Sequence, residues 1–296
     1  MRPGLSKTRG VIKGVLAAMF WGFNGAVTQY IFSHYAITSY QIACIRMISA
    51  GLVLLLFLFL REGRQAAGIL RDRAGRKYLL MFSVFGLVFN QTCYFNAIRY
   101  SDAGTATVMQ SMSTLVILLF TCVAEKRIPP KLQMGAVCLA LFGVYLVSTE
   151  SGRGLALTPL GLVWGLLLAI AAAAYILLSR PIVRRWSSMA AVGYGMLIGG
   201  IIFSAAIRPW HDFPAVDARF LILFAYHVLF GTVAAFSLFL SCINDIGPVS
   251  GNLIGNIEPL TASVVAAALL HTAFTVRDIT GFLCIMSAVI IVQLTV

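Results

Sequence analysis

Residues 37–60 read ITSYQIACIRMISAGLVLLLFLFL, an apolar run whose single charged side chain is Arg46. A helix needs about 20 apolar residues to cross a bilayer. Because lipid offers the backbone no hydrogen-bond partners, a run of this kind is expected to be a helix that pairs its peptide groups internally. A transmembrane barrel would instead show short segments of alternating polarity.

The rest of the chain repeats this pattern. Ten apolar runs are found, at about residues 10–32, 37–60, 78–99, 103–124, 131–149, 159–180, 188–207, 219–243, 247–270 and 278–295. Of the 296 residues, 60% are hydrophobic and 11% are charged, whereas soluble domains have about 45–50% and about 25%. This composition excludes a soluble enzyme, a disordered chain and a secreted disulfide scaffold. It predicts an all-α polytopic membrane protein with ten transmembrane helices.

The charge distribution predicts the orientation of the chain. The formal net charge is +12, from 22 Lys and Arg against 10 Asp and Glu. These cations lie in short clusters between apolar runs, which argues against a nucleic-acid partner and favours a topology signal. Most of them fall in loops on the side of the N-terminus. We therefore expect a multi-pass protein of the inner (plasma) membrane with both termini cytoplasmic.

The two halves of the chain resemble each other. Three pairs of segments match in order, namely 13–18 with 164–169, 85–86 with 230–231, and 125–135 with 271–281. They predict two five-helix units, residues 1–150 and 151–296. Because five is odd, the second unit begins on the opposite face of the membrane, so the units are inverted repeats. Such repeats are typical of alternating-access carriers with a substrate site near the bilayer midplane.

Several short motifs carry a resemblance to a known family: Phe20-Trp21-Gly22 with Asn24, Ala97 to Ser101, Glu125 with Gly135, and Glu258-Pro259 followed by Gly281. On these residues the whole chain resembles the ten-helix, EamA-type branch of the drug/metabolite transporter superfamily. Within that branch it is similar to the aromatic amino-acid exporters. Two features depart from the family. Ser113 stands where proline is frequent, and neither the first nor the sixth helix has the carboxylate that binds protons in the small multidrug relatives.

Two charged side chains lie at bilayer depth, where such groups are costly and often functional. Glu258 is interpreted either as a proton or cation site, or as a structural acceptor beside a kink at Pro259. Arg46 either forms an ion pair with Glu258, with a structural or gating role, or faces a cavity and holds a carboxylate with two hydrogen bonds.

Polar and aromatic side chains within the runs are the candidates for substrate binding. These residues are Trp21, Asn24, Asn90, Tyr94, Gln110, Trp164, Tyr175, Phe236, Asn252 and Asn256. The amides suit the amino and carboxylate groups of a zwitterion, although small polar groups also simply hold membrane helices together. The rings suit an aromatic substrate, although they also pack in cores or sit at the membrane interface.

The resemblance implies a secondary carrier or facilitator that exports small metabolites, with aromatic or large apolar amino acids as the expected substrates. A multidrug, purine or other metabolite exporter and a channel stay open as alternatives. An intramembrane enzyme would need a catalytic set such as HExxH, which is absent, and His227 and Ser237 have no carboxylate nearby to orient them. The expected partners are a small molecule and the lipid bilayer, without nucleic acid, and the protein is expected to be a monomer that is not an enzyme.

No cofactor or metal is expected from the sequence. The histidines have no metal-ligand spacing, and each of the six cysteines lies in a different apolar run. A GxxxxGK[ST] loop, which would cradle nucleotide phosphates, is also missing, so the chain is not expected to hydrolyse ATP.

Overall fold

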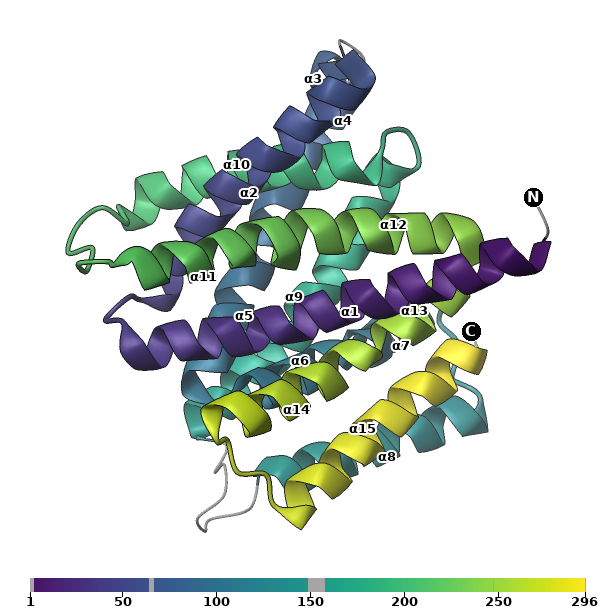
Figure 1. Ribbon diagram of the computed structural model, residues 1–296. Helices are drawn as coiled ribbons and strands as arrows, with labels where there is room; N and C mark the ends of the chain where they lie inside the picture. Colours follow the sequence, from purple (N-terminus) through teal and green to yellow (C-terminus); the bar gives the residue numbers. More distant parts are fainter. Residues whose placement is uncertain (1–2, 64–66, 149–157, 247, 296) are drawn as a thin grey trace.

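A computed structural model describes residues 3–63, 67–148, 158–246 and 248–295 as a bundle of helices that run between two opposite ends of the molecule (Figure 1). The first part of the chain forms α1 (Pro3–His34), α2 (Ser39–Glu62), α3 (Gly68–Arg71), α4 (Arg73–Met81), η2 (Phe82–Val88), α5 (Phe89–Tyr100), α6 (Ala103–Ser111), α7 (Ser113–Ala124) and α8 (Lys131–Ser148). The second part forms α9 (Pro159–Val183), α10 (Ser188–Ile207), α11 (Ala218–Val228), η3 (Leu229–Ala234), α12 (Ala235–Ile246), α13 (Pro248–Gly255), α14 (Ile257–Leu270) and α15 (Val276–Thr295).

The predicted fold class is confirmed. Within the described residues, nine helical stretches are long and apolar enough to cross a membrane, and α8 is a shorter apolar helix at the position of the remaining predicted run. Large apolar side chains also cover the outside of the bundle, where Leu60 is 78% and Ile222 is 70% exposed. An outer surface of this kind is stable in lipid and unstable in water.

Capping residues explain where many of these helices begin. Thr38 and Gln41 form a capping box at α2, in which the Gln41 amide donates to Thr38 Oγ1 at 3.1 Å and the Thr38 amide donates to Gln41 Oε1 at 2.9 Å. Asp102, Thr158, Ser187 and Asp217 cap α6, α9, α10 and α11 in the same position. Each side-chain oxygen satisfies a backbone amide that has no partner within its helix.

Four of the predicted spans are interrupted, although the sequence predicts continuous helices. The π-helical segments η2 and η3 widen the third and eighth spans, and such segments are frequent at functional sites. The fourth and ninth spans break at Met112 and Asn256. At each break the amide donates three residues back, Met112 to Met109 at 3.2 Å and Asn256 to Leu253 at 3.3 Å. Hydropathy did not predict these breaks because the spans that contain them are apolar overall.

The helices of the two parts of the chain pack in a regular way. Three of the large contacts join helices that hold the same place in the order of spans in each part: α2 with α10 (second), α6 with α14 (fourth) and α8 with α15 (fifth). Two other large contacts join the first span of one part to the third span of the other, since α1 packs on α12 and α5 packs on α9. The chain begins and ends at the same end of the bundle (Figure 1).

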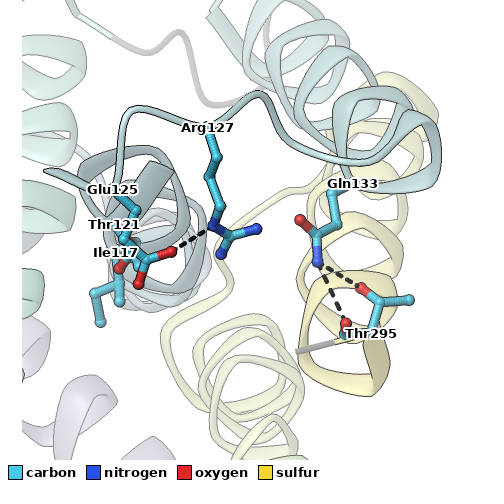
Figure 2. A network of polar contacts seen from close by, with 6 residues as sticks. All are labelled: Ile117, Thr121, Glu125, Arg127, Gln133 and Thr295. Carbon is cyan, nitrogen blue, oxygen red and sulfur yellow. Dashed lines mark hydrogen bonds and ion pairs between the residues drawn. The ribbon is translucent and has the colours of Figure 1, made fainter. Parts of the chain in front are cut away.

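Two glycines bring α8 and α15 into direct contact. A Cβ atom on Gly281 would lie 2.8 Å from the Gly143 carbonyl oxygen, and one on Gly143 would lie 2.7 Å from the Gly281 carbonyl oxygen. Small residues at such a crossing let the two backbones approach. Near the chain's C-terminus, Gln133 Nε2 donates to the Thr295 carbonyl oxygen at 3.3 Å, which joins the same two helices (Figure 2).

The turn between α7 and α8 holds the Glu125 motif. Arg127 Nε donates to Glu125 Oε2 at 2.5 Å, with both side chains substantially exposed (Figure 2), and Lys126 between them adopts a positive φ of 52°. Exposed ion pairs contribute about 0–1 kcal/mol. This motif therefore shapes a surface turn and lies apart from the interior of the bundle.

Candidate functional site

A cavity of about 350 Å³ lies among helices from both parts of the chain. Its volume is in the range of small-molecule sites, about 300–1,000 Å³. Ten of the residues expected to bind substrate or ions line it, namely Trp21, Asn24, Arg46, Asn90, Tyr94, Gln110, Tyr175, Phe236, Asn256 and Glu258. The structure therefore brings together side chains from α1, α2, α5, α6, α9, α12 and α14.

The cavity extends toward the end of the bundle that carries both termini. Gln293, in the last turn of α15, forms part of its lining, and Asn256 Nδ2 donates to Gln293 Oε1 at 2.8 Å. On α1 the lining residues are Trp21 and Asn24, near the middle of the helix.

Arg46 is the cation of the cavity. It lies in the third turn of α2 and is 6% exposed. Its Nη1 donates to Gln91 Oε1 at 3.2 Å, its Nη2 donates to Thr232 Oγ1 at 3.3 Å, and its guanidinium carbon lies 5.5 Å from the centre of the Phe95 ring. Gln91 follows η2 and Thr232 lies within η3, so one side chain bridges the third and eighth spans.

The ion pair between Arg46 and Glu258 that the sequence suggested is not formed. Among the described residues, the ion pairs within 4.0 Å are Lys13–Asp245, Arg127–Glu125 and Arg185–Asp72. The reason is local, because the guanidinium is drawn to neutral oxygens on α5 and η3. Arg46 and Glu258 nevertheless line the same cavity.

Glu258 is placed by a helix break. It is the second residue of α14, which begins directly after the break at Asn256. Pro259 is in the first turn of α14, and a proline disrupts the turn before it, which is where the helix breaks at Asn256. This placement fits a proline break beside Glu258, so the structural interpretation of Glu258 stands next to the ion site. A half-helix that starts at a cavity is also the arrangement found around the sites of many transporters.

Several buried polar atoms around the cavity have no hydrogen-bond partner within the protein. They include Asn24 Oδ1, Arg46 Nε, Asn90 Oδ1 and Gln110 Oε1, all from lining residues. Buried polar groups are almost always paired. These four atoms, by contrast, lack a protein partner among the described residues in this arrangement of the helices.

One wall of the cavity is aromatic. The Trp21 ring lies 5.4 Å from that of Phe236 and 5.0 Å from that of Phe239, at interplanar angles of 76° and 59°. Tyr175 adds a ring that is supported by Phe82 at 5.3 Å. Edge-on pairs of this kind leave ring faces and edges for a further aromatic group.

Two of the expected binding residues do not belong to this arrangement. Trp164 lies in the second turn of α9, where it is half-buried against the apolar cluster that contains Ile42, Cys93 and Phe220. It is not part of the cavity lining. The Asn252 side chain lies outside the described residues.

The residues of the site that escaped the sequence analysis include Gln91, Thr232, Phe239 and Gln293. Gln91 is next to Asn90, so a search for all amides in this helix would have found it. Thr232 is 186 positions from Arg46, and no local pattern relates the two residues.

Polar contacts join the two parts of the chain at the end away from the termini. The Tyr35 hydroxyl donates to Asp217 Oδ1 at 2.6 Å, Arg219 Nη1 donates to the Tyr30 hydroxyl at 3.1 Å, and Gln29 Nε2 donates to Thr272 Oγ1 at 3.0 Å. The hydrogen bond from Tyr35 lowers the pKa of the Asp217 carboxyl below its usual value. These contacts hold α1 against α11 and the α14–α15 connection.

A second hollow, of about 380 Å³, lies between α1, α11 and α14. Its lining is apolar apart from Tyr30 and Arg219. Because it lacks converging polar groups, it is a weaker candidate for a substrate site than the central cavity.

A bundle that crosses the membrane many times around a polar central cavity has the architecture of a membrane transport protein. The chain belongs to the EamA-like transporter family, whose model matches residues 8–149 and 159–294. It is thus a multi-pass inner membrane transporter of the drug/metabolite transporter superfamily, as the motifs predicted.

Curated relatives and a solved structure agree with this assignment. The chain is 31% identical over 290 residues to the uncharacterized inner membrane transporter YicL of Salmonella typhimurium, which covers 98% of this chain and 96% of the relative. It is 26% identical over 201 residues to the pseudopaline exporter CntI of Pseudomonas aeruginosa, covering 68% and 67%. A crystal structure 14% identical in sequence matches 97% of this chain and 98% of that chain with a TM-score of 0.63, which supports the fold alone.

Proposed function

We propose that the protein exports small metabolites from the cytoplasm by alternating access, with aromatic or large apolar amino acids as its substrates. The observation that carries this proposal is the central cavity, in which polar side chains and an aromatic wall face one space between the two parts of the chain. The volume of about 350 Å³ accommodates a single amino acid.

The proposal includes two inverted five-helix units, residues 1–150 and 151–296. Three observations support them. The family model matches each part of the chain separately. The interruptions η2 and η3 and the breaks at Met112 and Asn256 fall in equivalent spans of the two parts. The second, fourth and fifth spans pack on their equivalents, while the first span of each part packs on the third span of the other. A two-fold relation between the units would produce all three features.

The orientation follows from the excess of Lys and Arg on the side of the N-terminus. With both termini cytoplasmic, the cavity reaches toward the cytoplasm, while the contacts of Gln29, Tyr30 and Tyr35 close the outer end. Export then requires these contacts to separate while the cytoplasmic end closes. The substrate must bind both states with comparable affinity, because a strong preference for one state would trap it.

The aromatic wall supports the preference for aromatic side chains. A ring placed beside Trp21 or Phe236 gains about 0.5–1.5 kcal/mol beyond the burial of its area. We expect the amide groups of Asn24, Asn90 and Gln110, which line the same cavity, to bind the polar end of the same molecule.

A second candidate is export of a different metabolite through the same cavity. The likeness to a relative named as a pseudopaline exporter favours it. The two candidates share a mechanism and differ only in the ligand.

Counterflow into proteoliposomes tests the proposal. Liposomes loaded with unlabelled phenylalanine should accumulate labelled phenylalanine with saturable kinetics, and unlabelled tryptophan should compete, whereas empty liposomes should not accumulate it. Flux that does not saturate would indicate a channel. If phenylalanine is not exchanged but another metabolite is, the second candidate, export of a different metabolite, would be supported in place of amino-acid export.

A further inference from the structure

Arg46 carries a buried charge that has no carboxylate from the described part of the chain in direct contact. It is 6% exposed at mid-span, and no carboxylate of the described residues lies within 4.0 Å of it. Its partners Gln91 and Thr232 are neutral. A cation at this depth costs several kcal/mol or more. Glu258 in the same cavity offsets part of this cost from a distance, and a ligand anion in direct contact with the guanidinium would offset more.

The guanidinium is held in a fixed plane with free donors. An arginine has five N–H groups, and the contacts with Gln91 and Thr232 use one on each terminal nitrogen. Nε is buried without a partner. The remaining donors match the two oxygens of a carboxylate, which arginine binds bidentately when its fork is held in place.

Glu258 supplies the opposite charge elsewhere in the same cavity. It lines the cavity from the first turn of α14, and no cationic nitrogen of the described residues lies within 4.0 Å of its carboxylate. Two opposite charges that share a cavity without touching match a ligand that bears both an anion and a cation.

From these contacts we infer that Arg46 binds the carboxylate of the ligand, that Glu258 faces its ammonium group, and that the substrate class is therefore zwitterionic amino acids rather than amines or uncharged aromatics. This inference rests on the proposed export function. It also assigns Gln91 and Thr232 as positioning residues, because they act on the ligand only through the orientation of Arg46.

The test compares three ligands that share one ring, namely phenylalanine, phenethylamine and 3-phenylpropionate. Their affinities for the purified full-length protein are measured by titration calorimetry. Phenylalanine should bind best, and loss of the carboxylate in phenethylamine should weaken binding by about 10- to 100-fold, the equivalent of a charged hydrogen-bonded pair. The inference is overturned if phenethylamine binds as well as phenylalanine, or if no carboxylate-bearing ligand of the three binds.

Two variants separate the effect of losing Arg46 on ligand binding from the general effect of losing an arginine. Arg46→Gln should lower the affinity for phenylalanine and phenylpropionate about 10- to 100-fold and leave that for phenethylamine unchanged. Arg99→Gln is the matched control. Arg99 donates to the Ile37 carbonyl oxygen and, like Arg46, lies 5.5 Å from a ring centre, that of Phe32, but it does not line the cavity. Unchanged phenylalanine binding in Arg46→Gln would refute the inference.

The wild-type comparison of ligands keeps the inference falsifiable even if Arg46→Gln fails to fold. Counterflow with the same three ligands separates the two proposals. Exchange of phenethylamine without exchange of phenylalanine would support transport and refute a zwitterionic substrate. Binding of phenylalanine that depends on Arg46, without any exchange, would support the zwitterion site and refute export.

Discussion

Gly22 offers the sharpest test of how α1 and α14 meet beside the cavity. A Cβ atom at this position would lie 2.6 Å from the Glu258 carbonyl oxygen and 2.8 Å from the Ala262 amide nitrogen. These atoms are backbone and cannot turn aside as a flexible side chain would. The substitution Gly22→Ala must therefore push the two helices apart and displace Glu258 from its place on the cavity wall.

The magnitude follows from two opposing terms. Overpacking of a tight contact costs about 1–3 kcal/mol, whereas exchange of glycine for alanine inside a helix gains about 0.5–1 kcal/mol. Gly135 isolates the second term, because a Cβ atom there meets nothing within 4 Å and the residue is exposed on α8. The difference between Gly22→Ala and Gly135→Ala should therefore be about 1–3 kcal/mol.

The assay is equilibrium unfolding of both variants in mixed detergent micelles, combined with counterflow in proteoliposomes. Gly135→Ala should be as stable as the wild type or slightly more stable, with full transport. Gly22→Ala should be less stable and should exchange substrate more slowly. Equal stability of the two variants would refute the close approach of α1 to α14 at this glycine.

Three further predictions concern other contacts of the described chain. The ion pair between Lys13 and Asp245 is 2.8 Å long and partly exposed, so the substitutions Lys13→Met and Asp245→Asn should show a coupling energy below about 1 kcal/mol in a double-mutant cycle of unfolding. A coupling above about 2 kcal/mol would show instead that the pair behaves as a buried one. Trp21→Ala should raise the KM for phenylalanine about 2- to 10-fold and that for alanine less, and equal effects in a counterflow assay would argue against ring contact. The hydrogen bond from Tyr35 lowers the pKa of Asp217, so the ionised carboxylate contributes its full stability above the unfolded pKa of about 3.9 and loses it as the pH falls through the lowered value. Unfolding midpoints should therefore fall more between neutral and acid pH in the wild type than in Asp217→Asn. Parallel curves would contradict the hydrogen bond between Tyr35 and Asp217.

The sequence was sufficient for the fold class because lipid imposes a simple rule. Long apolar runs such as residues 37–60 have to be helices, and the structure has helices at the predicted runs. Capping residues such as Thr38 and Asp102 then fix several helix starts. The π-helical segments and the breaks at Met112 and Asn256 were not predictable, because they depend on packing between distant helices and not on local polarity.

The candidate site was predictable as a set of residues and not as a set of contacts. Polar groups inside apolar runs are rare enough to be noticed, and most of those selected line one cavity. The hydrogen-bond partners of Arg46 could not be predicted from the sequence, because Thr232 lies on another helix far along the chain. Trp164 was selected for its ring alone, and its place near the end of α9 sets it against a different cluster.

The central claim is that one cavity opens alternately to the two sides of the membrane. It is tested most directly by the side from which a cysteine in the cavity can be labelled. Ser111→Cys, on the cavity lining, is treated with a membrane-impermeant thiol reagent from each side in vesicles of known orientation, after the accessible native cysteines are exchanged for serine. A companion protein also carries Tyr35→Cys and Asp217→Cys, which a short bifunctional reagent joins across the outer contact.

The account predicts labelling from both sides, a shift in the preferred side when phenylalanine is added, and loss of labelling from the outer side alone once the outer pair is joined. Labelling from both sides that persists with the outer pair joined would indicate a pore. Labelling from one side under every condition would contradict alternating access.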